Sequence, residues 1–188
     1  MSADHLRILG IPGSLRRQSY NRGLLEAARE VAPDGMAIEI ADLRPIPFYD
    51  GDVDAEGEPA SVRAFKAQIA GVDALLIATP EYNHLLSGVL KNAIDWASRP
   101  AGKSVLRHKP AAIMGASGGT SGTARAQLAL RQVLTSTECY VLPSPQVLVP
   151  NARDRFDAEG RLTDERVREH IRALLDALRE WVERFRAR

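Results

Sequence analysis

Short apolar segments alternate with amphipathic helical stripes along this chain. The predicted strands are residues 6–11, 37–41, 74–79, 110–116 and a broken fifth strand at 140–142 and 147–149. The predicted helices are residues 21–31, 61–70, 88–98 and 123–134, followed by a long last helix that Thr163 caps and that runs through Val167 to Phe185. Strands that are apolar throughout belong in a parallel sheet with helices on both faces.

Five such strands predict an α/β, doubly wound five-stranded parallel sheet of order 2-1-3-4-5, with helices on both faces and residues 1–188 forming a single domain. Ligands of these sheets bind at the carboxyl ends of the strands, near the point where the strand order reverses. The loops after strands 1, 3 and 4 are therefore the expected functional loops. We expect Pro45–Pro59 to form a long surface loop, Ser61 to cap the helix that follows it, and Leu128 to share the buried stripe of its helix.

Composition excludes several classes of function. The chain has 25 Lys and Arg against 24 Asp and Glu, a net charge of +1, so nothing points to nucleic acid or a membrane surface as a partner. The single cysteine, Cys139, excludes an intramolecular disulfide and a cysteine-based metal site. We expect a soluble cytoplasmic protein without a secretion signal or a membrane span.

The loop after the first strand is rich in hydrogen-bond donors. Ser14, Ser19 and Asn21 offer short polar side chains, and Arg16 or Arg17 offers a guanidinium group beside the start of a helix. Such a helix start binds anions, so this loop suits a terminal phosphate. The alternative is a polar turn in which Ser19 or Asn21 only caps the helix. The loop lacks both the G-x-G-x-x-G and the G-x-x-x-x-G-K-[ST] patterns.

The other two loops suit a planar ring. The second loop, Thr79–His84, carries a proline, an exposed tyrosine and an amide, and the third, Ala116–Gly122, is rich in glycine and hydroxyl groups. Each loop alone could be an ordinary turn, and His84 alone could be a plain loop residue. If the strand order holds, the three loops converge, and together they fit flavin mononucleotide (FMN), which has one phosphate, a ribityl chain and a three-ring system.

These motifs resemble the NADPH-dependent FMN reductase family, a flavodoxin-like family that includes bacterial quinone and chromate reductases. The resemblance rests on G-S-L-R at 13–16 with Ser19 and Asn21, on P-E-Y-N at 80–83, and on L-K-N-A-I-D-W at 90–96. Family members commonly have a proline just before the glycine equivalent to Gly88, where this chain has Leu86-Ser87.

The resemblance implies a set of cofactor-binding residues. Those expected at the phosphate end are Ser14, Arg16, Ser19, Tyr20 and Asn21. Those expected along the ribityl chain and ring are Pro80, Glu81, Tyr82, Asn83 and His84, with Ser117 and Gly118 at the ring edge. The resemblance also implies a homodimer or homotetramer, with two candidate interface helices: the one carrying Lys91, Asn92 and Trp96, and the one carrying Arg125 and Arg131.

The leading hypothesis is an oxidoreductase in which NADPH or NADH reduces bound FMN, and the flavin then reduces a quinone or similar small-molecule acceptor. No catalytic side chain is expected, and the four histidines (His5, His84, His108, His170) lack the spacing of a metal site. The alternatives are a flavodoxin-like electron carrier without substrate turnover and a non-catalytic domain.

Overall fold

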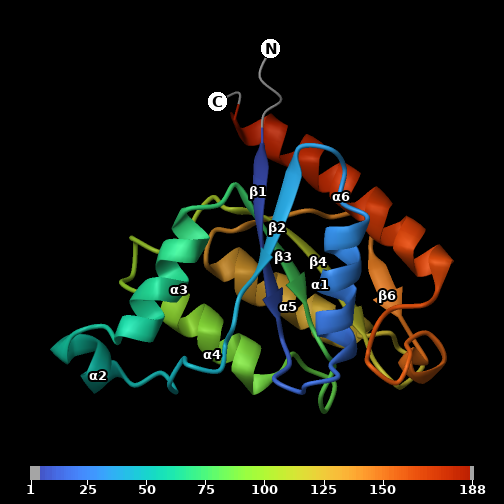
Figure 1. Cartoon of the computed structure of the whole chain (residues 1–188). Coiled ribbons are helices and arrows are strands. Elements are labelled where there is room, and N and C mark those ends of the chain that lie inside the picture. The colour runs from blue at the N-terminus through green and yellow to red at the C-terminus, as the bar shows by residue number, and fades with distance from the viewer. Residues whose placement is uncertain (1–4, 187–188) are drawn as a thin grey trace.

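The computed structural model describes residues 5–186 and confirms the predicted sheet (Figure 1). Its strands are β1 (Leu6–Pro12), β2 (Met36–Ile40), β3 (Ala74–Ala78), β4 (Pro110–Ala116), β5 (Tyr140–Val141) and β6 (Val147–Val149). All are parallel, in the order β2-β1-β3-β4-β5, and β6 also pairs with β4. The broken fifth strand therefore consists of two short pieces that extend the same edge.

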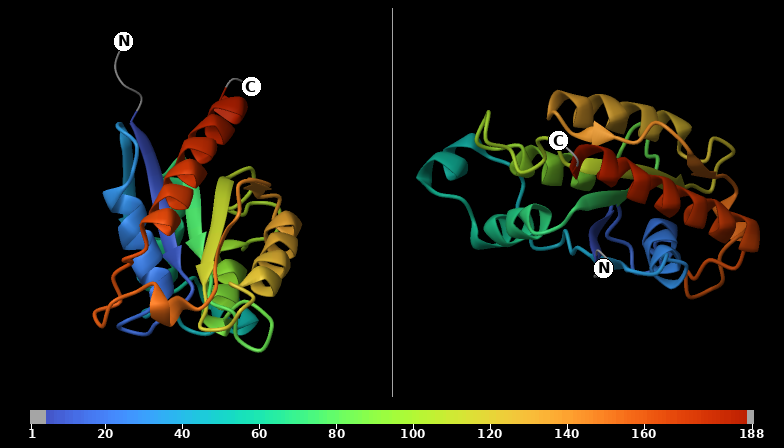
Figure 2. Two further views of the ribbon diagram at one scale, coloured as in Figure 1. Left: turned by 90° about the vertical axis from the view of Figure 1, so that its right-hand side faces the viewer. Right: turned by 90° about the horizontal axis from the view of Figure 1, so that it is seen from above.

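The helices cover both faces of the sheet (Figure 2). They are α1 (Tyr20–Glu30), α2 (Gly51–Glu56), α3 (Ala60–Ala70), α4 (Gly88–Ala97), α5 (Ala124–Ser136) and α6 (Glu165–Arg186), with a short 3₁₀ helix η1 (Ala152–Asp154). Helices α1 and α6 pack on one face, and α3, α4 and α5 pack on the other. Each face of the sheet therefore has its own hydrophobic core: the first core lies under α1 and α6, and the second lies under α3, α4 and α5. In β3, Leu76 points into the first core and Leu75 and Ile77 into the second, because successive side chains of a strand point to opposite faces.

Four local predictions were wrong. The segment 45–59 is not all loop, because Asp50 accepts a hydrogen bond from the backbone of Asp52 and starts the short helix α2. Ser61 is not a cap, since α3 begins one residue earlier, after Pro59. At α6, Asp164 rather than Thr163 accepts from the first backbone N–H groups. Leu128 is 72% exposed.

Helix α6 is the longest, at 22 residues, and its apolar stripe packs on the sheet while its outer face is charged. Within residues 5–186, no helix is both long enough and apolar enough to cross a membrane. Burial raises the pKa of the Cys139 thiol to about 12, so this cysteine stays protonated inside the second core.

Candidate functional site

The loops after β1, β3 and β4 meet at the carboxyl ends of the strands, at the lower edge of the sheet in Figure 1. They enclose a cavity of about 100 Å³. It is lined by Ser14, Arg16, Ser19, Tyr20, Asn21, Pro80, Glu81, Tyr82, Ala116, Ser117 and Gly118. Gly13 lets the first two loops touch, because a Cβ at this position would lie 2.8 Å from the Pro80 ring. The predicted convergence of the three loops is therefore present in the structure.

The first loop presents donors at the start of α1. Ser19 caps this helix, and its hydroxyl accepts a hydrogen bond from the backbone N–H of Arg22 at 3.3 Å. The Arg16 guanidinium lies 5.8 Å from the centre of the Tyr20 ring, and no carboxylate in residues 5–186 pairs with it. An unpaired cation beside a helix N-terminus and two hydroxyl groups is a donor set that suits a phosphate monoester.

Asn21 lines the cavity, and its side chain also binds the backbone of β4. Its side-chain N–H donates to the carbonyl of Ala116 at 3.0 Å, and its oxygen accepts from the N–H of Ala116 at 2.9 Å. The side chain is 3% exposed, so both bonds are buried. They join the first turn of α1 to the carboxyl end of β4, and so fix the first loop relative to the third.

The second loop ends in a two-residue hairpin. Tyr82 and Leu85 exchange both backbone hydrogen bonds at 3.0 Å, and between them Asn83 and His84 adopt φ values of 51° and 67°. Asparagine is a favoured residue for the left-handed position of such a turn. The structure places Asn83 and His84 at this exposed tip, outside the cavity lining, whereas Pro80 and Tyr82 line the cavity.

Glu81 also lines the cavity, but its carboxylate is turned toward α5. It accepts hydrogen bonds from the Ser121 hydroxyl and from the backbone N–H groups of Arg125 and Ala126. Burial opposes ionisation of Glu81, but these bonds outweigh it and hold its pKa below the ordinary value of 4.5. The carboxylate is therefore charged at neutral pH and fully engaged by protein donors.

The third loop leaves space for a flat ligand. A Cβ at Gly118 or Gly119 would meet no atom within 4 Å. The loop is nevertheless anchored, since the N–H of Ser117 donates to the carbonyl of Val149 and the N–H of Asn151 donates to the carbonyl of Gly119, at 3.0 and 3.1 Å. Open space beside an anchored backbone allows a ring edge to approach closely.

Sequence reasoning missed the role of Ser87. Its hydroxyl accepts from the N–H of Leu90, capping α4, and donates to the carbonyl of Gly13 at 2.5 Å. The residue that stands where family members commonly have proline therefore ties the start of α4 to the first loop. Serine before a helical stripe was the available signal, because serine is a preferred cap.

Two residues of the predicted interface helix hold a neighbouring segment instead. Asn92 binds the N–H of Tyr49 and the carbonyl of Pro47 at 2.7 and 2.8 Å, and the Trp96 indole N–H donates to the same carbonyl at 2.9 Å. Trp96 is fully buried, so it offers no surface to a partner. The residue between the two anchored positions, Phe48, is 86% exposed.

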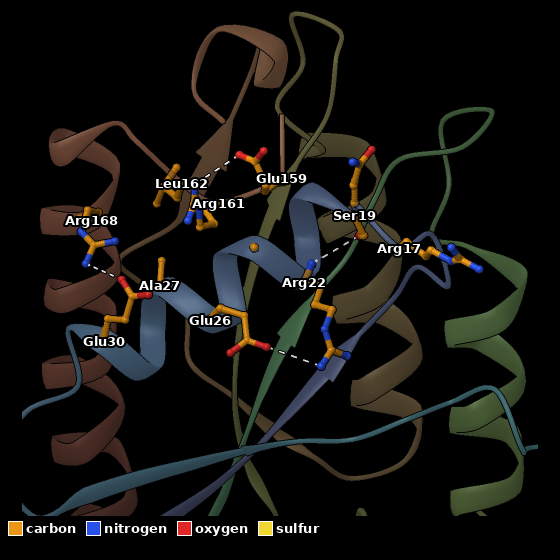
Figure 3. A pocket seen from close by; sticks show the side chains of 13 residues that line it. Arg17, Ser19, Arg22, Glu26, Ala27, Glu30, Glu159, Arg161, Leu162 and Arg168 are labelled. Atoms are coloured by element: carbon orange, nitrogen blue, oxygen red, sulfur yellow. Dashed lines mark hydrogen bonds and ion pairs between the residues drawn. The ribbon is translucent and has the colours of Figure 1, made fainter. Parts of the chain in front are cut away.

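A second cavity adjoins the first along α1 and contains paired charges (Figure 3). Both cavities share Ser19, but in the second Arg22 pairs with Glu26 at 3.5 Å, and Arg168 pairs with Glu30 at 2.8 Å. Arg161 likewise pairs with Glu159 at 3.2 Å. Three of the four arginines that line the second cavity thus have carboxylate partners, which leaves Arg17, and the three glutamates would repel an anion. The first cavity is the better anion site, because its lining has one carboxylate, Glu81, and that carboxylate is turned toward α5.

The residues of the first cavity fit FMN. The hydroxyl and guanidinium donors lie together on the first loop, and the tyrosine and the open glycines lie on the other two. That division matches a molecule with a phosphate at one end and a planar ring at the other.

Comparison with known proteins supports this interpretation. A family model described as NADPH-dependent FMN reductase matches residues 6–154. An NAD(P)H-dependent FMN reductase of Pseudomonas aeruginosa is 52% identical over 184 residues, covering 98% of this chain and 99% of that protein. A 2-hydroxy-1,4-benzoquinone reductase of a Burkholderia species is 42% identical over 177 residues, covering 94% and 96%. The solved structure of FerB, a flavoenzyme NAD(P)H:(acceptor) oxidoreductase from Paracoccus denitrificans, matches with a TM-score of 0.86 at 33% identity, covering 95% and 98%.

Proposed function

This chain belongs to the NADPH-dependent FMN reductase family, and from that premise we propose that it is an FMN-dependent oxidoreductase that passes reducing equivalents from NAD(P)H to a quinone. The observation that carries the proposal is the meeting of three loops around one cavity, with hydroxyl and guanidinium donors on the first loop and a tyrosine and an open glycine on the other two. When bound there, FMN supplies the hydride and electron chemistry that the protein's own side chains lack.

The protein's residues would bind and orient the cofactor. Ser14, Arg16 and Ser19 would hold the phosphate, because they combine hydroxyl groups with an unpaired guanidinium at the start of α1. Tyr20 lies beneath Arg16 and would keep that guanidinium at the cavity. The ribityl chain and ring would lie along Pro80 and Tyr82, with the ring edge at Ser117 and Gly118. Asn21 and Glu81 would act on the shape of the cavity rather than on the flavin.

The lining favours an uncharged planar acceptor over an oxyanion such as chromate. Arg16 is the one cationic side chain among the lining residues in the described part of the chain, and the phosphate would occupy it. Nearby, Arg125 is held by Glu81 at 3.3 Å. The aromatic ring of Tyr82 and the side chain of Leu85 are 49% and 56% exposed on the hairpin, next to the cavity, and provide apolar surface for a quinone.

Spectroscopy and turnover test the proposed function directly. The purified protein, supplied with FMN, should show the absorption of bound oxidised flavin near about 450 nm. It should also oxidise NADPH or NADH in the steady state when 1,4-benzoquinone is present. Bound flavin without quinone-dependent oxidation would indicate an electron carrier instead. A protein that takes up no FMN would be a non-catalytic domain, and the proposal would be wrong.

We further propose that the protein is a cytoplasmic homo-oligomer, a dimer or a tetramer, whose interface includes Phe48 beside α4. The backbone on both sides of Phe48 is held by Asn92 and Trp96, so this large apolar ring is fixed in an exposed position. Aromatic side chains such as phenylalanine are enriched at protein–protein interfaces. A second copy of the chain is the occupant that we propose.

Phe48→Ser tests the oligomer. The ring is 86% exposed, so its loss should leave the fold of each subunit intact while it weakens association. Sedimentation velocity at micromolar concentration should show the wild type as a dimer or tetramer and the variant shifted toward monomer. Leu128→Ser is the matched comparison, because it removes an exposed apolar side chain from α5, the other candidate interface helix. An interface at Phe48 predicts unchanged sedimentation for Leu128→Ser. A monomeric wild type, or dissociation by Leu128→Ser and not by Phe48→Ser, would contradict the assignment.

A further inference from the structure

Helix α5 begins without a capping side chain of its own. The residue before it, Thr123, is in the left-handed conformation with φ 73°, and its side chain makes no capping bond. Its hydroxyl oxygen instead accepts from the side-chain N–H of Gln127 at 3.1 Å. The second and third N–H groups of a helix are those that a capping residue normally binds, and in α5 they belong to Arg125 and Ala126.

The Glu81 carboxylate satisfies both of these groups from a different loop. One oxygen accepts from the N–H of Arg125 at 3.0 Å and from that of Ala126 at 3.2 Å. The other oxygen accepts from the Ser121 hydroxyl at 3.0 Å and from the Arg125 guanidinium at 3.3 Å. The side chain is only 7% exposed. A buried carboxylate with bonds this specific, at the positive end of a helix, is an effective cap.

This cap controls one end of the third loop. The segment 117–122 runs from β4 to α5, and its first half is held by backbone bonds to Val149 and Asn151. Its second half is held by Glu81 through Ser121 and the first turn of α5. Gly118, beside which there is open space, lies within the first anchored half, between Ser117 and Gly119. The second loop therefore fixes the end of the third loop that leads into α5, while 149–152 hold the end next to β4.

We propose that Glu81 is a positioning residue: by capping α5 from the second loop, it holds segment 117–122 at the spacing that the flavin ring requires. This inference rests on the proposed function. Two basic side chains face the carboxylate: the Arg125 guanidinium from α5, and the His84 imidazole on the hairpin, whose Nδ1 lies 3.8 Å from it. Glu81 acts through the loop and not by contact with the reacting atoms.

Three measurements on Glu81→Gln and Glu81→Ala test the proposal. In the flavin-free protein, hydrogen exchange of the amides in 117–122 and at Arg125 and Ala126 should accelerate at least tenfold in Glu81→Ala. In FMN titrations followed by flavin fluorescence, the dissociation constant should rise at least tenfold for Glu81→Ala and less for Glu81→Gln, whose remaining oxygen still accepts hydrogen bonds. If Glu81→Ala fails to fold, Glu81→Gln alone must show both effects.

The third measurement is a pH profile. Since the pKa of Glu81 is lowered by folding, its contribution is fully present above about pH 4.5 and is lost as the pH falls through the lower folded pKa. The difference in free energy of unfolding between the wild type and Glu81→Gln should therefore be constant at neutral pH and shrink in acid. A cap that merely filled space would give a difference that does not change with pH.

Asp164→Ala is the matched control, because Asp164 accepts from the N–H groups of Arg166 and Val167 at the start of α6 in the same manner. It should lower stability while leaving the FMN dissociation constant and the exchange of 117–122 within twofold of wild type. The proposal is overturned if Glu81→Ala, or Glu81→Gln where Glu81→Ala does not fold, likewise leaves the FMN dissociation constant and the exchange of 117–122 within twofold of wild type. If the wild type binds no FMN, the proposed function fails, and the exchange data alone still decide whether Glu81 holds the loop.

Discussion

Replacing Asn21 with alanine should cost the flavin-free protein about 2–6 kcal/mol of unfolding free energy, the largest loss that we expect from any single side chain of the site. The variant leaves the N–H and the carbonyl of Ala116 without their partners, and Ala116 is 2% exposed, so water cannot replace them. Each unsatisfied buried group costs about 1–3 kcal/mol. A domain of ordinary stability has about 5–15 kcal/mol in total, so the variant should unfold readily.

Equilibrium unfolding in urea measures this loss, and it should be carried out without FMN, since ligand binding adds its own stability. Asn92→Ala is the matched control. Asn92 also makes two amide bonds to backbone groups, at Tyr49 and Pro47, but in a partly exposed setting. Water can replace those bonds, so Asn92→Ala should lose clearly less unfolding free energy than Asn21→Ala. An Asn21→Ala protein no less stable than Asn92→Ala would contradict the structural role assigned to Asn21.

The sequence alone predicted the sheet and the loops of the site because both follow from local patterns. Apolar runs mark the strands wherever they lie, and the strand order then brings Ser14, Tyr82 and Ser117 to one edge. Asn83 and His84 were included with them because they belong to the same motif, but a two-residue hairpin turns both toward solvent. The direction of the side chains at a turn depends on backbone φ and ψ angles, and the spacing of a sequence motif does not specify these angles.

The contacts between loops could not be predicted, because they depend on side chains that meet only after folding. Asn21 and Ala116 are 95 residues apart, and Glu81 lies 45 residues before Ala126. A carboxylate in a loop gives no local sign of the helix that it will cap. Leu128 shows a different kind of error, since a residue two positions from Leu130 points to nearly the opposite side of a helix. Counting apolar residues without regard to that spacing placed Leu128 in the core.

Arg16→Ala should weaken FMN binding roughly ten- to a hundredfold. Arg16 lines the cavity from the first loop and has no carboxylate partner in residues 5–186, so its guanidinium is free for the phosphate that we propose there. A hydrogen bond between charged groups contributes about 1.5–3 kcal/mol, and about 1.4 kcal/mol corresponds to a tenfold change in affinity. Arg16→Lys should fall between the variant and the wild type, because lysine keeps the charge but loses the two-pronged donor geometry.

Two controls separate this effect from general damage to the loop. Riboflavin carries the same ring without the phosphate, so Arg16→Ala should bind it as well as the wild type does. Arg17→Ala removes the neighbouring exposed cation, which lines the second cavity and not the first, and should leave the FMN dissociation constant within about twofold. Rising salt should reduce the difference between Arg16→Ala and wild type, since the contact is partly exposed and screened. If Arg16→Ala retains wild-type FMN affinity, Arg16 does not bind the phosphate. If it loses riboflavin affinity to the same extent as FMN affinity, Arg16 supports the loop instead, and in either case the assignment of Arg16 to the phosphate is wrong.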